Sequence, residues 1–397
     1  MPVLKFPGGF FWGAATSSHQ VEGGQHNDWS EWEKLGTIND GTASGNAADH
    51  WNRYAADFDI AKSLGHNAHR FSVEWSRIEP QPGQWDEAAL VHYRDVVRAL
   101  LERGIEPFVT LWHFTNPVWF SVSGGWESPE APHRFVRYVE NVVRALPDVT
   151  YWMTLNEPNV YALLSYLIGY WPPEVKQWRR ALRVYRTMAE AHRLAYAAIK
   201  RANPNASVGI ATSAIDYVPA RQTSLFDRWM SKCCDRWYNR WFIERTINEL
   251  DFIGINHYVR QGIRVRSFKQ PIMTEPRGDQ LTDYGWGICP EAMGKVLQSM
   301  WKYRKPLYIT ENGLADAADR RRGKFIRDEL IELHKAISSG VDVRGYLHWS
   351  LLDNFEWREG FAMRFGLVAV DVKTLERTVR ESARWFSGVC RHNQLDV

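Results

Sequence analysis

The sequence predicts an α/β fold, a single (β/α)8 barrel (TIM barrel) that takes in residues 1–397 and carries extended loops on the C-terminal face of the barrel. Two observations predict it. Eight short runs of β-branched and aromatic residues recur, with starts about forty to sixty residues apart. Amphipathic segments typical of helices lie between these runs. Eight such βα units in one chain are the count of this barrel.

The eight predicted strands follow one another without a linker rich in Pro, Gly or Ser between them. They cover Phe10–Ala15, His69–Glu74, Ile105–Leu111, Thr150–Leu155, Ser207–Thr212, Phe252–Asn256, Pro306–Thr310 and Val343–Trp349. The clearest predicted helices cover Asp86–Arg103, Pro132–Leu146, Trp178–Arg201, Pro290–Tyr303 and Phe325–Ser338.

A doubly wound sheet is the main competing fold. Such a sheet usually carries a glycine-rich turn after its first strand. Here the first run continues into Gly13-Ala14-Ala15-Thr16, without GxGxxG spacing and without a P-loop. A bare barrel needs roughly 250 residues. The remainder of the 397 residues is therefore expected in long loops, which would build a deep pocket at the C-terminal ends of the strands.

Composition excludes several classes of function. There are 49 Lys and Arg against 46 Asp and Glu, a net charge of +3, which argues against a nucleic-acid partner. Four cysteines in 397 residues do not form a disulfide framework or a zinc motif. We find neither a signal peptide nor a bilayer-spanning run and expect a cytoplasmic protein with no membrane partner. Composition leaves the oligomeric state open.

Polar or stacking residues follow nearly every predicted strand, where a barrel of this type places its active site. In chain order they are Gln20, Arg70, His113, Asn156 with Glu157, Ser213, Asn256 with Tyr258, Glu311 with Asn312, and Trp349. Tryptophan is also frequent, with 20 residues, and part of this excess is expected to line a ring-shaped ligand.

Two of these strand ends carry a glutamate, Glu157 after the fourth strand and Glu311 after the seventh. Strands three units apart lie across the barrel mouth, so the two carboxyl groups can face each other over a substrate. Carboxyl groups about 5 Å apart are typical of retaining glycoside hydrolysis, in which one attacks the anomeric carbon and the other protonates the leaving oxygen. The alternative, that each glutamate only begins the next helix, is less favoured for two at matching strand ends.

Five segments resemble the β-glucosidases of glycoside hydrolase family 1, in the right order and over nearly the whole chain. These segments run from Phe10 to Gly23, Arg70 to Ile78, Thr154 to Pro158, Thr310 to Gly313 and Trp349 to Trp357. The resemblance implies that Glu311 is the nucleophile and Glu157 the general acid and base. It also implies that Gln20, His113, Asn156, Glu356 and Trp357 bind sugar hydroxyls, with Trp349 as a stacking floor, and that Arg70, Asn256 and Tyr258 support the nucleophile.

The residue types fit these roles physically. A nearby guanidinium such as Arg70 lowers the pKa of a carboxyl group, which suits a nucleophile, whereas an acid must keep its proton in a drier site. Trp126 or Trp286 could add further stacking on the sugar. The chemistry needs no cofactor and no metal, and although His66 and His69 are close in sequence, no acidic or cysteine ligand completes a site.

The predicted function is therefore a retaining β-glycosidase. It would release terminal non-reducing β-D-glucosyl residues from oligosaccharides or from aryl and alkyl glycosides, through a covalent glycosyl-enzyme. The predicted partner is this small-molecule β-glycoside. The sequence leaves β-galactosyl and β-fucosyl substrates open. Two alternatives also stay open, a transglycosylase of the same fold and a non-catalytic sugar-binding member of the family.

Overall fold

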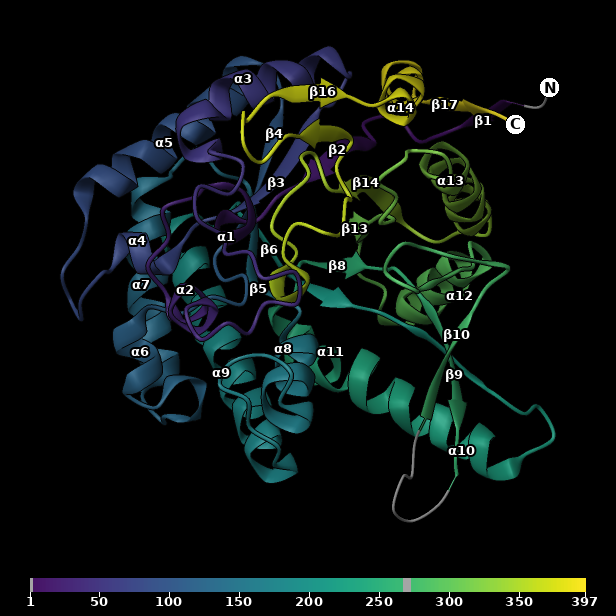
Figure 1. Cartoon of the computed structure of the whole chain (residues 1–397), viewed down its shortest axis with the longest axis horizontal. Helices are drawn as coiled ribbons and strands as arrows, with labels where there is room; N and C mark the ends of the chain where they lie inside the picture. Colours follow the sequence, from purple (N-terminus) through teal and green to yellow (C-terminus); the bar gives the residue numbers. More distant parts are fainter. Residues whose placement is uncertain (1–2, 267–272) are drawn as a thin grey trace.

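Eight parallel strands close into a barrel in a computed structural model that describes residues 3–266 and 273–397. The order around the barrel is β13-β14-β2-β3-β4-β5-β6-β8, which follows the chain (Figure 1). The strands are β2 (Phe11–Ala15), β3 (Ala68–Ser72), β4 (Glu106–Thr110), β5 (Tyr151–Asn156), β6 (Ser207–Ser213), β8 (Phe252–Asn256), β13 (Leu307–Asn312) and β14 (Val343–Trp349). The predicted barrel is confirmed, and each predicted strand overlaps an observed one.

A principal helix follows each barrel strand and packs outside it (Figure 1). In chain order these helices are α3 (His50–Ser63), α5 (Glu87–Glu102), α7 (Ala131–Ala145), α9 (Trp178–Ala202), α11 (Trp241–Thr246), α12 (Glu291–Met300), α13 (Arg322–Ser338) and α14 (Glu381–His392). The five predicted helices match five of these, and α12 continues as a 3-10 turn, η5 (Trp301–Tyr303).

Local signals explain where these helices begin. Asp86 precedes α5, and its side chain accepts a hydrogen bond from the backbone N–H of Ala89 at 2.9 Å. This bond satisfies one of the amide groups that a helix start leaves without a partner. Pro132 stands in the first turn of α7, where its missing N–H costs nothing.

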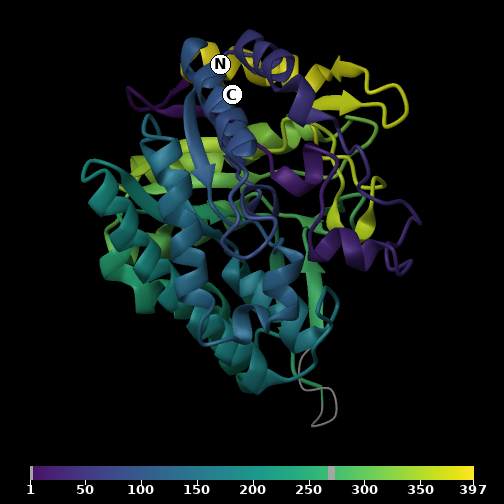
Figure 2. The same cartoon turned by 90° about the vertical axis from the view of Figure 1, so that its left-hand side faces the viewer.

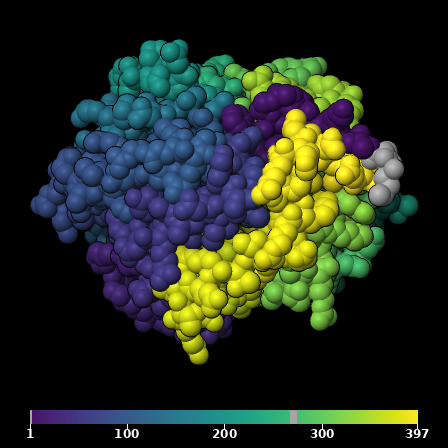
Figure 3. Space-filling model, turned by 90° about the horizontal axis from the view of Figure 1, so that it is seen from above, coloured from purple at the N-terminus to yellow at the C-terminus, as the bar shows by residue number. Residues whose placement is uncertain are grey.

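The two ends of the chain lie side by side and complete the ring of helices. β1 (Val3–Lys5) pairs antiparallel with β17 (Gln394–Asp396), and the two termini are close in both Figure 1 and Figure 2. Figure 3 shows the C-terminal segment as a yellow band between early segments in blue and purple and later ones in green. Within the described residues, no helix combines the length and the apolar character needed to cross a membrane.

Aromatic side chains fill the lower part of the barrel. Phe108, Tyr151, Phe252 and Tyr308 project inward from four strands, and Phe108 and Tyr151 stack with ring centroids 4.3 Å apart. Such filling makes the barrel interior a packed core rather than a pore. A cavity can therefore form only above these rings, at the C-terminal ends of the strands.

The loops at that end are long and partly ordered into small elements, as expected. After β6 and β8 they form a three-stranded sheet of β7 (Asp216–Pro219), β9 (Arg260–Arg264) and β10 (Met273–Arg277). Two more hairpins follow, β11 (Gln280–Leu281) with β12 (Gly287–Ile288), and β15 (Val368–Val370) with β16 (Arg377–Val379). The loop helices are α1 (Ser18–Val21), α2 (Asp28–Glu33), α4 (Trp75–Ile78), α6 (Val118–Val122), η1 (Gly125–Glu127), α8 (Pro158–Tyr161), η2 (Ala162–Ile168), α10 (Leu225–Cys234), η3 (Asp235–Arg240), η4 (Ile247–Glu249) and η6 (Trp357–Glu359).

Candidate active site

A cavity of about 250 Å³ opens at the C-terminal ends of the barrel strands, and both predicted catalytic glutamates line it. Eight of the eleven predicted site residues line the cavity, namely His113, Asn156, Glu157, Tyr258, Glu311, Trp349, Glu356 and Trp357. The remaining three, Gln20, Arg70 and Asn256, are fully buried behind this lining.

Glu311 stands near the end of β13 and accepts hydrogen bonds on both carboxylate oxygens. Arg70 Nη1 donates to Oε1 at 2.5 Å, and the Tyr258 hydroxyl donates to Oε2 at 2.7 Å. Arg70 also donates to Asn156 Oδ1 at 2.6 Å and to Thr110 Oγ1 at 3.0 Å, so its guanidinium is held in place. Arg70 and Tyr258 therefore contact Glu311 as the sequence predicts.

Burial nevertheless raises the pKa of Glu311 above its usual value, and the charge of Arg70 and the hydroxyl of Tyr258 oppose this rise. The sequence-based expectation considered only the guanidinium, which on its own lowers the pKa. The structure adds the cost of removing the carboxylate from water, and this cost is the larger effect.

Fewer hydrogen bonds and positive charges stabilise the ionised form of Glu157 than that of Glu311. Asn256 Nδ2 donates to its Oε1 at 2.9 Å. Burial, followed by repulsion from Glu311, raises the pKa of Glu157 to about 8, so this carboxyl group holds its proton at neutral pH. The expected drier site for this residue is present. Asn256, predicted to support Glu311, donates to Glu157 and to Asn156 Oδ1 at 3.1 Å, and its side chain also acts to lower the pKa of Glu311.

The backbone at Glu157 is strained. Its φ of 44° and ψ of 56° lie in the left-handed region, which a residue with a Cβ seldom adopts. Pro158 follows as the first residue of α8, so Glu157 occupies a sharp turn between β5 and that helix. Strained residues of this kind concentrate at functional sites, where the surrounding structure holds them.

The predicted sugar-binding residues other than Asn156, which ends β5, gather on the side of the cavity above β14, β2 and β4. Gln20 Nε2 donates to Glu356 Oε2 at 3.2 Å and to the carbonyl of Phe355 at 3.0 Å. Gln20 is fully buried, so it orients Glu356 from behind. Burial and repulsion from Glu311 raise the pKa of Glu356 to about 8.

Two tryptophans and a histidine form an aromatic wall on the same side. The ring of His113 stacks on those of Trp349 and Trp357, with centroids 6.0 Å apart in each case. Asn156 Nδ2 lies 3.2 Å from His113 Nε2. Burial and the charge of Arg70 keep the pKa of His113 well below its usual value, so its imidazole is neutral and able to bind hydroxyl groups.

The opposite side of the cavity is the more apolar one, although Ser213, Tyr238 and Gln261 also line it, and it was mostly missed from the sequence. Its lining comes from the segments that follow β5, β6 and β8 and includes Val160, Leu164, Ile215, Val259, Tyr284 and Trp286. Tyr284 and Trp286 stack with centroids 4.2 Å apart. Only Trp286 was expected here, as one of the tryptophans available to stack on a sugar, because no strand pattern predicts the course of these long loops.

Trp126, the other tryptophan considered for sugar stacking, lies elsewhere. It is fully buried, and its indole N–H donates to Asn116 Oδ1 at 3.0 Å. Its neighbours are Trp75, Trp112, Phe120 and Phe135, so it belongs to the packed core.

Comparisons with known proteins agree with this arrangement. The model of "Glycosyl hydrolase family 1" matches residues 3–249 and 244–395. A "Beta-glucosidase A" of Acetivibrio thermocellus is 32% identical over 446 residues, with 99% of this chain and 100% of the relative covered. A "Beta-galactosidase" of Sulfolobus acidocaldarius is 31% identical over 98% of this chain and 96% of the relative.

Solved structures give the same result. A "beta-glycosidase from Pyrococcus horikoshii" superposes with a TM-score of 0.95 and 38% identity, covering 100% of this chain and 97% of the other. The "Beta-glucosidase from Thermotoga maritima in complex with glucoimidazole" superposes with a TM-score of 0.92 and 30% identity, covering 98% of this chain and 99% of the other. The chain belongs to glycosyl hydrolase family 1.

Proposed function

We propose that this protein is a retaining β-glycosidase that removes terminal β-D-glucosyl residues by double displacement. One observation carries the proposal. Two buried carboxyl groups, Glu157 and Glu311, line one cavity, and the first holds a proton at neutral pH while an arginine and a tyrosine bind the second. This is the division of roles that retaining hydrolysis needs.

In the first step the Glu311 carboxylate attacks the anomeric carbon while the bond from that carbon to the leaving oxygen breaks. Glu157 gives its proton to that oxygen, so the leaving group departs as a neutral alcohol. The product is a glycosyl ester of Glu311, and Arg70 and Tyr258 hold the ester for the second step.

In the second step water attacks the anomeric carbon and Glu157 takes its proton, which releases the sugar with its original anomeric configuration. The change of role follows from charge. Repulsion from Glu311 contributes to the high pKa of Glu157, and ester formation removes that negative charge. The pKa of Glu157 then falls, and its carboxylate becomes available as a base.

The lining of the cavity also favours a class of leaving group. The acid must lie beside the leaving oxygen, so the leaving group extends over the side of Glu157, where Val160, Ile215 and Trp286 lie. Aryl and alkyl glycosides suit this apolar side, whereas the hydroxyl-rich sugar suits the side of Glu356 and Trp357. The similarity to named β-glucosidases supports glucose as the sugar, and the similarity to a named β-galactosidase keeps galactose as a second candidate.

The same proposal takes residues 1–397 as one catalytic domain, because barrel strands and surrounding helices extend from residue 11 to residue 392. A cytoplasmic location also stays a proposal. It is supported by the four cysteines, Cys233, Cys234, Cys289 and Cys390, which are all free thiols.

A panel of nitrophenyl glycosides tests the function. We expect release of nitrophenol from β-glucosides and no release from α-glucosides, with NMR showing that the β-anomer of glucose forms first. Binding of glucose without turnover of any β-glycoside would identify a sugar-binding protein instead. Transfer to added alcohols in preference to water would identify a transglycosylase.

A further inference from the structure

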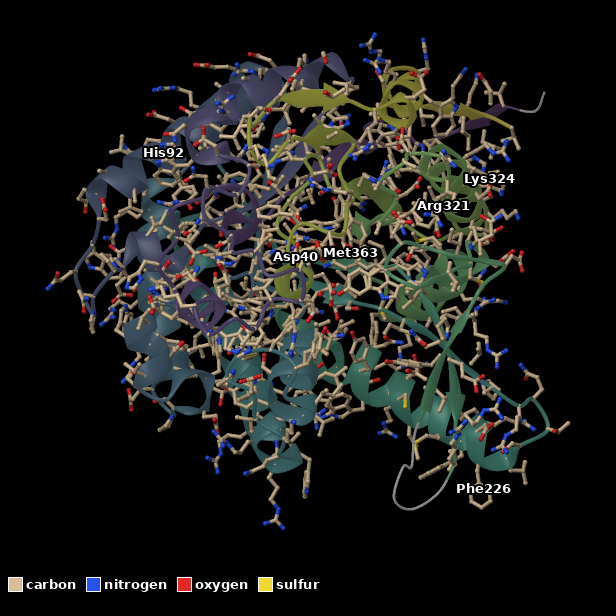
Figure 4. The ribbon with its side chains drawn as sticks, in the orientation of Figure 1. Asp40, His92, Phe226, Arg321, Lys324 and Met363 are labelled. Carbon is tan, nitrogen blue, oxygen red and sulfur yellow. The ribbon has the colours of Figure 1, made fainter. Side chains whose placement is uncertain are left out.

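Helix α10 exposes three large apolar side chains at a corner of the protein. Leu225 is 73% exposed, Phe226 is 73% exposed and Trp229 is 61% exposed. Leu225 and Trp229 are four residues apart and so share one side of the helix, with Phe226 beside them. In Figure 4, Phe226 lies at the outer edge of α10, away from the barrel. We call these three side chains the α10 face.

A cavity of about 410 Å³ adjoins this face, between α10 and α12. Three exposed cations line it, Arg228 and Lys232 from α10 and Lys295 from α12. None of the three has a carboxylate partner within residues 3–266 and 273–397. These cations stand next to the exposed apolar side chains on the same helix.

The acidic groups nearby are already neutralised. Asp216 and Asp235 line the cavity, but Asp216 pairs with Arg260 at 2.6 Å and Asp235 pairs with Arg240 at 2.5 Å. Asp227, on the inner side of α10, is buried and pairs with Arg221 at 2.8 Å. The side of α10 that faces solvent is therefore both apolar and positively charged.

Exposed Leu, Phe and Trp beside Lys and Arg form the pattern of a helix that lies in a membrane interface. Trp suits this position because its ring is apolar while its N–H can stay hydrated. A second copy of the chain fits less well, since two such faces in contact would bring like charges together.

We propose that the α10 face binds an anionic phospholipid surface. Leu225, Phe226 and Trp229 enter the headgroup region, and a lipid phosphate is held in the cavity by Arg228, Lys232 and Lys295. This departs from the sequence-based expectation of no membrane partner, which considered only spanning segments and leader peptides.

Ile215 lines both this cavity and the catalytic one. The apolar side of the catalytic cavity is therefore adjacent to the surface that would face the lipid.

Vesicle sedimentation tests the proposal with the full chain. We expect the protein to sediment with vesicles of phosphatidylcholine mixed with phosphatidylglycerol, and to sediment less with phosphatidylcholine alone. Added salt should weaken binding because it screens the attraction between the cations and the lipid phosphates. Equal sedimentation with neutral and anionic vesicles, or none with either, would overturn the proposal.

Three variants distinguish the contribution of the apolar side chains to vesicle binding from that of the cations. Leu225→Ser, Phe226→Ser and Trp229→Ser together should reduce binding to anionic vesicles about tenfold or more, because the apolar anchors are lost. Arg228→Gln, Lys232→Gln and Lys295→Gln together should remove the preference for anionic lipid. Val122→Ser, which changes an apolar side chain that is 80% exposed elsewhere, is the control and should bind like the unchanged protein.

Hydrolysis of a soluble nitrophenyl glycoside should be unchanged in every variant, which shows that each one folds. Light scattering checks for self-association. If the parent forms a dimer that is lost in the triple serine variant, and the parent does not bind vesicles, then the α10 face binds a second copy of the chain and not lipid. Binding of inorganic phosphate at the cavity without vesicle binding would reduce the site to an anion site and would also overturn the proposal.

Discussion

The two sides of the catalytic cavity differ in the chemistry of their side chains. Above β14, β2 and β4, polar groups such as Gln20 and Glu356 bind one another while aromatic rings stack beside them. Above β5, β6 and β8, apolar groups such as Ile215 and Val259 predominate. The polar side is built to recognise one ring of hydroxyl groups, whereas the apolar side contacts whatever is attached to it. Specificity for the sugar and tolerance of the leaving group can thus coexist in one cavity.

The largest expected effect on activity comes from replacing the nucleophile Glu311, because every substrate reacts with it. Glu311→Ala should lower kcat by on the order of 10⁵-fold, because no covalent intermediate can form. Azide should restore part of the turnover of a nitrophenyl β-glucoside and yield an α-glucosyl azide, which NMR identifies. The control is Glu106→Gln, because Glu106 begins β4 at the end of the barrel away from the cavity. This variant should keep full activity. A β-configured azide product would contradict the assignment of Glu311.

The effect of Glu157→Gln on the rate should depend on the leaving group of the substrate. Hydrolysis of alkyl glucosides should fall about 10²- to 10⁴-fold, because their leaving oxygen needs a proton. Formation of the glycosyl-enzyme from a dinitrophenyl glucoside should fall far less, as a burst measured by stopped flow would show. An equal loss of rate on both substrates would show that Glu157 is not the general acid.

The pH profile gives a second measure of the same carboxyl group. Glu157 must be protonated in the first step, so kcat/KM should fall as the pH rises above about 8, where the group ionises. Glu311 must be ionised, so kcat/KM should also fall toward acid pH. In Glu157→Gln the alkaline fall should disappear for the dinitrophenyl substrate. If it persists, another group titrates there, and Glu356 is the first to examine because its pKa is also about 8.

Changes on the polar side should affect all leaving groups alike. Glu356→Gln should lower kcat/KM about 10- to 100-fold for aryl and alkyl glucosides, because the amide replaces a carboxyl oxygen that accepts hydrogen bonds from the sugar. Glu359→Gln, three residues later and bonded to Asn39 and Tyr170, is the matched control. A loss confined to one class of leaving group would mean that Glu356 does not bind the sugar.

The smallest effects belong to the apolar side. Ile215→Asn should raise KM about three- to tenfold for octyl glucoside, since it removes apolar contact area. Inhibition by free glucose should stay unchanged, and Ile215→Val should behave almost like the parent. If inhibition by glucose weakened by the same factor as KM rises, Ile215 would also affect binding of the sugar.

Most of the polar groups of the cavity could be predicted from sequence, since they directly follow barrel strands or lie in short distinctive segments. Asn156, Glu157, Glu311 and Trp349 are examples, because a strand end fixes where the next side chain can point. The apolar side could not be predicted in this way. Tyr284 and Ile215 reach the cavity from loops whose paths depend on packing between segments far apart in the chain.

The amino-acid sequence was enough to predict the barrel, because eight buried strands with helices between them have few ways to satisfy their backbone and cover their apolar faces. It also determined which carboxyl groups meet, because strand order fixes their places around the mouth. The protonation states of Glu157 and Glu311, in contrast, follow only from the folded structure. They depend on burial and on the distances to Arg70 in β3 and to Asn256 and Tyr258 at the end of β8. Electrostatic energies change steeply with such distances and with exposure to water, and neither can be read along the chain.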